Sequence, residues 1–180
     1  MADKDQTSQF IVEWAAAMAS ACRPPRRALD IAMGRGRHAL VLAEHGFRVF
    51  GVDVNLNAVR DAVAQASAHG LVVRGWCADL TEFPLARERF ELVVVSRYLQ
   101  RDLFPSLRDA LTPGGVVLFE TFTEAQRGRG RGPTSSDHLL APGELRARFD
   151  AFEVLFYEEV VEPDAVARIV AKKSAKEKTP

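Results

Sequence analysis

The chain has 180 residues, 47% of them hydrophobic and 27% charged, which is ordinary for one folded domain with a sizeable core. Because its 24 basic residues balance its 24 acidic ones, net charge favours neither a nucleic acid nor a membrane as partner, and we expect neither. No apolar run approaches the roughly 20 residues of a membrane helix. The N-terminal stretch MADKDQTSQF has no export signal, so we predict a cytoplasmic protein whose Cys22 and Cys77 are free thiols.

The first two thirds of the chain alternate between short apolar runs and segments with helical spacing. A helix is predicted over residues 9–21 and ends at Pro24 and Pro25, since proline cannot continue it. The elements that follow are a strand over 28–32, a glycine turn at 34–36, a helix over 37–44 ended by Gly46, a strand over 48–52, a helix from its N-cap Asn55 to residue 68, strands over 71–76 and 90–95, a helix over 99–111 and a strand over 115–120. This alternation predicts a parallel sheet covered on both faces.

The last third breaks the alternation. Residues 121–142 contain RGRGRGP and few apolar side chains, which predicts a long mobile loop. After it come a short helix over 143–149 and an antiparallel pair of strands over 152–161 and 165–171. The predicted fold is a Rossmann-like three-layer α/β sandwich, with a mostly parallel seven-stranded sheet that ends in an antiparallel hairpin. We expect one domain over residues 1–173 and a disordered polar tail over 174–180.

Gly34 and Gly36 lie where the first strand gives way to a helix. In a parallel sheet, ligands bind at the carboxyl ends of the strands, glycine lets the backbone approach a ligand closely, and the free N–H groups of the next helix point at it. A tight strand-to-helix connection is the alternative for this turn alone. Asp53 follows the second strand about 20 residues later, where a carboxylate can accept both hydroxyls of a ribose, although it can also cap the next helix.

Asp79 and Leu80 follow the third strand, where the carboxylate can accept the exocyclic amine of adenine while the leucine covers the ring. The three strand ends together predict a site for an adenosine that carries a group at its 5′ end. A dinucleotide would favour a complete Gly-X-Gly-X-X-Gly pattern, but Ala32 and Ala39 stand where glycines are expected. Asp30 can meet an ammonium group directly or through water, so an adenosine with an amino-acid group fits better than one with phosphates.

With these residues the chain resembles the class I S-adenosylmethionine-dependent methyltransferases. The matching motifs occur in the family's order and occupy most of residues 28–123: LDIAMGRGRHA, VFGVDVN, CADLTEFPL, FELVVVSRYL and LTPGGVVLFETF. Ala32 replaces the first glycine of the family's first motif. Within the family the chain resembles the small bacterial methyltransferases of the tellurite-resistance type, to which GRGRHA and HLLAPGELRARF, residues 138–149, look similar.

The resemblance implies S-adenosyl-L-methionine as the cofactor and S-adenosyl-L-homocysteine as its product. It places the methionine part at the glycine turn, the ribose at Asp53, adenine at Asp79 and Leu80, and the sulfonium above Ser96 and Arg97. The residues that we expect to bind the cofactor are Asp30, Ala32, Met33, Gly34, Arg35, Gly36, Arg37, Asp53, Val54, Asp79, Leu80 and Ser96. Methyl transfer has no obligatory general base, and we expect no metal site.

The candidate catalytic residues are Arg97, Tyr98 and Arg101, which follow the fourth strand, where the family places groups that face the substrate. Arginine binds oxyanions and carboxylates bidentately, so we predict a small anionic acceptor, with a chalcogen oxyanion among the candidates. Surface arginines at a helix start are the alternative. The segment Arg127–Gly132 can be a cationic lid, a nucleic-acid contact or a plain loop.

Two other functions stay open at this point. A nicotinamide-dependent oxidoreductase shares the ribose carboxylate, but the chain lacks the third glycine and an identifiable catalytic Tyr-Lys or His arrangement. A non-catalytic S-adenosylmethionine-binding domain would share the whole cofactor site. The sequence leaves the oligomeric state open, and for His38 it leaves two roles, a helix residue near the cofactor or a substrate contact.

Overall fold

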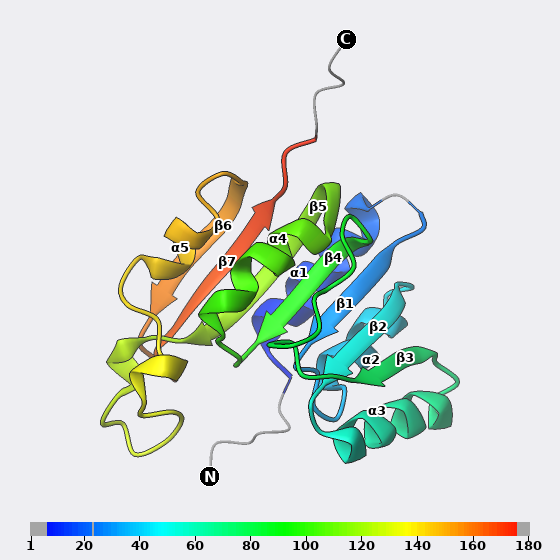
Figure 1. Ribbon diagram of the computed structural model, residues 1–180, viewed down its shortest axis with the longest axis horizontal. Coiled ribbons are helices and arrows are strands. Elements are labelled where there is room, and N and C mark those ends of the chain that lie inside the picture. The colour runs from blue at the N-terminus through cyan, green and yellow to red at the C-terminus, as the bar shows by residue number, and fades with distance from the viewer. Residues whose placement is uncertain (1–6, 23, 176–180) are drawn as a thin grey trace.

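The computed structural model describes residues 7–22 and 24–175, which form one seven-stranded sheet in the order β3-β2-β1-β4-β5-β7-β6 (Figure 1). The strands are β1 Arg27–Ile31, β2 Arg48–Asp53, β3 Val73–Cys77, β4 Phe90–Ser96, β5 Leu111–Phe122, β6 Glu153–Val160 and β7 Val166–Lys172. Strands β1 to β5 run parallel, whereas β7 is antiparallel to both of its neighbours, β5 and β6. The predicted Rossmann-like sheet with an antiparallel C-terminal hairpin is confirmed.

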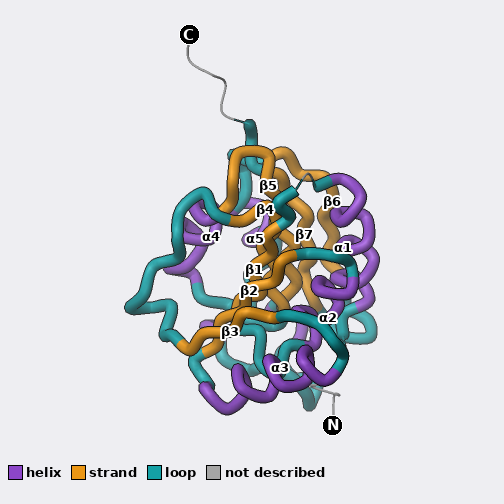
Figure 2. Tube along the Cα trace, turned by 90° about the vertical axis from the view of Figure 1, so that its right-hand side faces the viewer, coloured by secondary structure: helices purple, strands orange, loops and turns teal. Residues whose placement is uncertain are grey.

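Helices cover both faces of this sheet within the described residues. They are α1 Gln9–Ala21, α2 Arg37–Glu44, α3 Leu56–Ala68, α4 Phe104–Ala110 and α5 Glu144–Arg148, with short 3-10 turns over Arg101–Leu103, Glu124–Gln126 and Ser136–His138. Helices α1, α2 and α3 pack on one face and α4 and α5 on the other, so the strands form the middle layer (Figure 2). Helix α3 begins at the predicted N-cap Asn55, whose side chain accepts the N–H groups of Asn57 and Ala58 at 3.0 and 3.3 Å.

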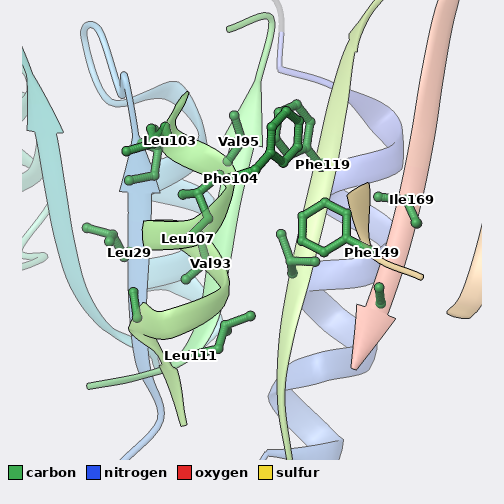
Figure 3. Close-up of a cluster of buried hydrophobic side chains, with 14 of the residues drawn as sticks. Leu29, Val93, Val95, Leu103, Phe104, Leu107, Leu111, Phe119, Phe149 and Ile169 are labelled. Carbon is green, nitrogen blue, oxygen red and sulfur yellow. The ribbon is translucent and has the colours of Figure 1, made fainter. Parts of the chain in front are cut away.

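Three phenylalanines from different elements form the centre of the core beneath α4. The rings of Phe104 in α4 and Phe119 in β5 stack with their centroids 5.4 Å apart, and Phe149 meets both rings edge-on at 5.7 and 6.4 Å (Figure 3). None of the three side chains is more than 2% exposed. Buried aromatic rings contribute large apolar areas and a favourable pair geometry. This cluster therefore fixes α4 and the end of α5 against β5.

The helix predicted over 99–111 is shorter in the structure. Residues 101–103 form a 3-10 turn, α4 covers only 104–110, and Leu111 is the first residue of β5. Leu111 is fully buried and pairs with Phe90 of β4, so strand pairing in the folded chain overrides its helical preference. As a result, β5 is twelve residues long and begins before the Thr-Pro-Gly-Gly stretch that was predicted to precede it.

The segment over 121–142, predicted as a mobile loop, is fixed at several points. Leu140 forms an isolated bridge with the residue that follows β5, and its side chain is fully buried. The buried amide of Gln126 accepts the Ala165 N–H at 2.7 Å and donates to the Arg131 carbonyl oxygen at 3.0 Å. Because both ends of this buried amide are satisfied, the segment is held against the turn between β6 and β7 instead of moving freely.

Two terminal expectations fall largely outside the described residues. The stretch examined for an export signal includes residues 1–6, and the predicted disordered tail includes residues 176–180, and neither range is among those described. Among the helices of the described part, none combines the length and the apolar character that crossing a bilayer requires. Cys22 and Cys77 are both free thiols, as predicted.

Replacing Phe104 by alanine should destabilise the fold, because the change removes two ring contacts and leaves a cavity in the core. We expect the free energy of unfolding, measured by urea denaturation, to fall by about 3–5 kcal/mol. Phe83 is 58% exposed, so Phe83→Ala is a matched control that should change this free energy by less than about 0.5 kcal/mol. Equal losses for the two variants would contradict this description of the core.

Candidate functional site

Strands β1 to β5 all end at one edge of the sheet, which we call the carboxyl edge. After β1 the chain turns sharply into α2 through Ala32, Gly34 and Gly36, whose φ angles are +52°, +54° and +80°. The turn is tied to the neighbouring strand by the Met33 N–H, which donates to the Val52 carbonyl oxygen at 3.0 Å. The first N–H groups of α2 therefore lie at the carboxyl edge, where they are available to a ligand.

Asp53, the last residue of β2, closes this turn. Its Oδ2 accepts the Gly34 N–H and its Oδ1 accepts the Asn55 N–H, both at 2.8 Å. Each carboxylate oxygen can accept a second hydrogen bond, so the side chain is held in one orientation and keeps acceptor capacity for hydroxyl groups. The structure thus brings the predicted ribose carboxylate directly to the glycine turn.

The small residues of the turn meet different needs. A Cβ at Gly36 would lie 2.7 Å from the Cβ of Ala62 in α3, so close packing of α2 on α3 requires this glycine. A Cβ at Gly34 would meet no described atom within 4 Å, so the space in front of Gly34 is open. The Met33 side chain points the other way, because it is 4% exposed and its Sδ lies 2.0 Å from where a Cβ on Gly51 would stand. Only the backbone of Met33 therefore faces the predicted site.

Two buried side chains beside the turn each have an oxygen that no described residue bonds. Asp30 in β1 is 1% exposed, and its Oδ2 accepts no hydrogen bond from any described residue. Burial raises the pKa of Asp30 to about 7, although the positive charge of Arg37 acts against that rise. Ser96, the last residue of β4, is also buried, and its Oγ is likewise unpaired among the described residues. Such unsatisfied atoms at the carboxyl edge fit a polar ligand group such as an ammonium.

Val54, Asp79 and Leu80 lie just beyond the ends of β2 and β3. Val54 is 70% exposed, and Leu80 packs half-buried against the core. Asp79 Oδ1 accepts the hydroxyl and the N–H of Thr81 at 2.7 and 2.9 Å, and these bonds lower the pKa of Asp79. The structure thus shows an oriented carboxylate at Asp79 next to a half-buried leucine, and the adenine contact of these residues stays a prediction.

Tyr98 lies on the same side of the carboxyl edge as Asp79. Burial, and then the negative charges of Asp79 and Asp53, raises the pKa of the Tyr98 phenol, whose hydroxyl donates to Gln100. A hollow of about 210 Å³ is lined by Leu80 and by Gln100, the residue that accepts the Tyr98 hydroxyl. A larger hollow, of about 500 Å³, lies at the amino ends of the strands and is lined by none of the predicted site residues. The structure thus groups Tyr98 with the predicted nucleoside contacts.

Arg97 precedes Tyr98 but turns toward β5. Its φ of +54° lies in the left-handed region, which is uncommon for a residue with a Cβ, and its N–H donates to the Glu120 carbonyl oxygen at 2.8 Å. Its Nη2 lies 3.7 Å from Asp164 Oδ2, and its guanidinium lies over the Phe122 ring, 5.8 Å from the centroid. The side chain therefore lies beside the end of β5, away from the predicted adenine contacts.

Arg101 and Arg35 are not brought into this group. Arg101 forms a bidentate ion pair with Glu144, at 2.8 and 2.9 Å, and donates to the Leu139 carbonyl oxygen at 2.8 Å. These bonds hold the segment before α5 in place and occupy the Arg101 donors, and the catalytic role of Arg101 stays a prediction. Arg35 is exposed and pairs with Asp61 of α3 at 3.4 Å, so its side chain also points away from the turn.

His38 connects the beginnings of α1 and α2. Its imidazole is 3% exposed, and its Nε2 accepts the N–H of Ser8, the N-cap of α1, at 3.1 Å. Burial, and then the positive charges of Arg37 and Arg97, lowers the pKa of His38 to about 3, so the ring is neutral and can accept this bond. Of the two roles left open, the geometry supports the helix residue near the turn.

Asp164 and Arg131 were not singled out as site residues from the sequence. Asp164, in the turn between β6 and β7, has its Oδ1 2.8 Å from Arg131 Nε and its Oδ2 3.7 Å from Arg97 Nη2. Arg129, two residues before Arg131 in the same segment, pairs with Glu162 at 2.5 Å. The positive charge of RGRGRG is the only feature of the sequence that points to Arg131, and it does not indicate which acidic residues this segment contacts.

Comparison with known proteins places these features in a family. A model of the methyltransferase domain matches residues 28–115. The chain is 34% identical over 104 residues to the ribosomal protein L11 methyltransferase of Thermus thermophilus and 33% identical over 104 residues to the malonyl-[acyl-carrier protein] O-methyltransferase of Pseudescherichia vulneris. The alignments cover 57% and 55% of this chain but 41% and 40% of those proteins, so the chain spans about two fifths of the length of the curated relatives it matches.

The fold is also similar to solved structures. TehB from Haemophilus influenzae superposes with a TM-score of 0.71 at 20% identity, covering 88% of this chain and 61% of that chain. At this identity the likeness shows the fold alone. The matched methyltransferase domain, the order of the motifs and the sheet topology together support a class I S-adenosylmethionine-dependent methyltransferase, with S-adenosyl-L-methionine as the cofactor.

Proposed function

We propose that this chain transfers a methyl group from S-adenosyl-L-methionine to a small anionic acceptor. The observation that carries the cofactor part is the Gly34–Asp53 hydrogen bond beside the buried Asp30 carboxylate, whose Oδ2 accepts no hydrogen bond from the described residues. Asp53 is an oriented carboxylate for the ribose hydroxyls, the turn at Gly34 is open, and Asp30 is a buried acceptor for an ammonium group. A dinucleotide would leave the buried Asp30 beside phosphates, which is electrostatically unfavourable.

Each predicted contact takes a definite part in the proposed complex. Asp30 meets the ammonium group, with Arg37 nearby, and Asp53 meets the ribose. Adenine lies among Val54, Asp79 and Leu80, with Tyr98 beside them, and Ala32, Gly34, Gly36 and Ser96 border the methionine part. Met33 and Arg35 contribute through the backbone, because their side chains pack on β2 and pair with α3.

Bound S-adenosyl-L-methionine supplies a methyl group on a sulfonium, which is already activated toward a nucleophile. The chain then has to hold the acceptor in line behind that methyl group and keep water away. An anionic acceptor brings its own lone pair, so it needs no general base. Arg97, directly after β4, supplies the positive charge that holds the acceptor.

The charge balance beyond β4 and β5 supports an anionic acceptor. Arg97 and Arg131 both approach the carboxylate of Asp164, while Glu162 pairs with Arg129 and its charge also acts on Arg131. Three arginines therefore face two carboxylates, an excess of one positive charge. Selenite and tellurite, which are small oxyanions, are our first candidates. The free thiols of Cys22 and Cys77 support the cytoplasmic location that we also propose.

The function is tested by binding and by turnover. Isothermal titration should show binding of S-adenosyl-L-homocysteine and no binding of NADH, and the reverse result would favour a nicotinamide-dependent oxidoreductase. Incubation with a labelled methyl donor and selenite, tellurite or small carboxylates should then give a methylated product. Label found only in neutral acceptors would contradict the anionic class.

Arg97→Ala should separate acceptor binding from cofactor binding. Because the Arg97 side chain lies beside β5 and away from Asp53 and Asp79, the affinity for S-adenosyl-L-homocysteine should change by less than about threefold. Turnover of an anionic acceptor should fall by at least about tenfold. The opposite pattern, weak cofactor binding with normal turnover at saturation, would place Arg97 in the cofactor site.

Asp53→Ala should weaken cofactor binding. The change removes the proposed ribose acceptor and also the bond that fixes the Gly34 turn, so we expect a loss of about 2–4 kcal/mol in the free energy of binding S-adenosyl-L-homocysteine. Asp61→Ala removes a nearby exposed carboxylate that pairs with Arg35, and this control should leave the affinity nearly unchanged. Equal affinities of Asp53→Ala and the wild type would remove Asp53 from the site.

Cofactor affinity should also depend on pH through Asp30. Its pKa of about 7 means that the carboxyl becomes protonated as the pH falls below 7 and can no longer pair with an ammonium group. Affinity for S-adenosyl-L-homocysteine, measured by titration calorimetry, should therefore fall below neutral pH, approaching about tenfold per pH unit, and level off above it. Asp30→Asn should bind weakly with a flat profile. A flat profile in the wild type would show that Asp30 does not meet the ammonium.

A further inference from the structure

The contacts around Asp164 differ from the other arginine–carboxylate pairs that the structure buries or half-buries. Arg27 donates two hydrogen bonds to Glu91 at 3.1 and 2.7 Å, and Arg101 donates two to Glu144 at 2.8 and 2.9 Å. Asp164 has two arginines close by but no such bond: Arg97 is 3.7 Å away, beyond hydrogen-bond length. An arginine–carboxylate pair is strong when its two hydrogen bonds are short and well aligned. Asp164 therefore interacts only weakly with its two arginines.

The Arg131 contact is short but misaligned. Its Nε lies 2.8 Å from Asp164 Oδ1, yet this buried oxygen has no hydrogen bond from any described residue. The side chains of Asp164 and Arg97 are 17% and 26% exposed, so neither can turn fully to water. The guanidinium N–H groups that Asp164 does not bond well can therefore still donate to another anion, if its oxygens are better placed.

The two arginines are nevertheless held in position. Arg97 keeps its left-handed backbone through the bond to the Glu120 carbonyl oxygen, and its guanidinium rests over Phe122. Arg131 is anchored by its own carbonyl oxygen, which accepts from the buried Gln126, and by its side chain, which donates to the Pro163 carbonyl oxygen. Uncommon backbone conformations that the surroundings hold in place are often found at functional sites.

We propose that Arg97 and Arg131 form a clamp for the oxyanion of the methyl acceptor, and that the Asp164 carboxylate competes with that oxyanion for the clamp. This inference rests on the proposed function, and it names a shape for the acceptor, an oxyanion with at least two oxygens that can bridge two guanidinium groups. Asp164 sets specificity: only an anion that hydrogen-bonds both arginines better than Asp164 does is retained. A neutral acceptor gains nothing from the clamp.

The test measures sulfate binding to the protein loaded with S-adenosyl-L-homocysteine, by titration calorimetry at constant ionic strength. Sulfate is the probe because it has the required oxygens and accepts no methyl group in the presence of the product. Asp164→Asn removes the competing charge and should tighten sulfate binding by about tenfold. Asp164→Asn combined with Arg131→Gln should lose that gain.

Glu162→Gln is the matched control, because it makes the same change of charge two residues away but frees Arg129, with which Glu162 pairs, and acts on Arg131 only through its charge. Its gain in sulfate affinity should be much smaller than that of Asp164→Asn. Equal gains in Glu162→Gln and Asp164→Asn, or no gain in Asp164→Asn, would overturn the clamp. Normal affinity of each variant for S-adenosyl-L-homocysteine shows that it is folded. Failure of the wild type to bind S-adenosyl-L-homocysteine would instead count against the proposed function.

Discussion

The hydrogen bond from the Gly34 N–H to Asp53 is the contact on which the arrangement of the site depends. The chain has to pass from β1 into α2 within five residues, which it does through three residues with positive φ. Such a turn has few internal hydrogen bonds, and the Asp53 carboxylate supplies one from the neighbouring strand. Because the same side chain also accepts the Asn55 N–H, the starts of both α2 and α3 are positioned relative to one carboxylate. A ligand that meets Asp53 therefore finds the open turn already in place.

A single residue then divides the carboxyl edge into two sides. Tyr98 remains close to Asp79, whereas Arg97, one position earlier, turns toward β5 and Asp164 because its backbone is left-handed. Consecutive residues in an ordinary extended segment would point to opposite faces of the sheet; here the φ of Arg97 directs its side chain along the edge. This arrangement leaves the predicted nucleoside contacts on one side and the positive charge for an acceptor on the other, with Ser96 between them.

The parts of the fold that depend on local pattern could be predicted from sequence, and the parts that depend on distant contacts could not. The alternation of elements, the cap at Asn55 and the position of Asp53 at a strand end follow from residue types and spacing. The residues around Leu111 favour a helix, but its pairing with Phe90 makes it the first residue of β5. The sequence predicts a substrate contact at Arg101, although a carboxylate 43 residues further on uses its donors. Charge alone does not reveal whether an arginine is already satisfied.

The same distinction explains why Asp30 and Arg101, both charged residues near the carboxyl edge, have opposite significance. The donors of Arg101 are matched by Glu144 and by backbone oxygens, so its charge stabilises the fold. Asp30 is buried with one oxygen unmatched among the described residues, and its raised pKa means that the folded state holds a proton more tightly than the unfolded chain does. The resulting stability is fully present below about pH 4 and is lost as the pH rises through about 7, where the carboxyl ionises in its buried place. A cation that fills this place would remove that cost, so the burial that makes the ionised Asp30 unfavourable in the isolated fold at neutral pH also favours a bound ammonium group.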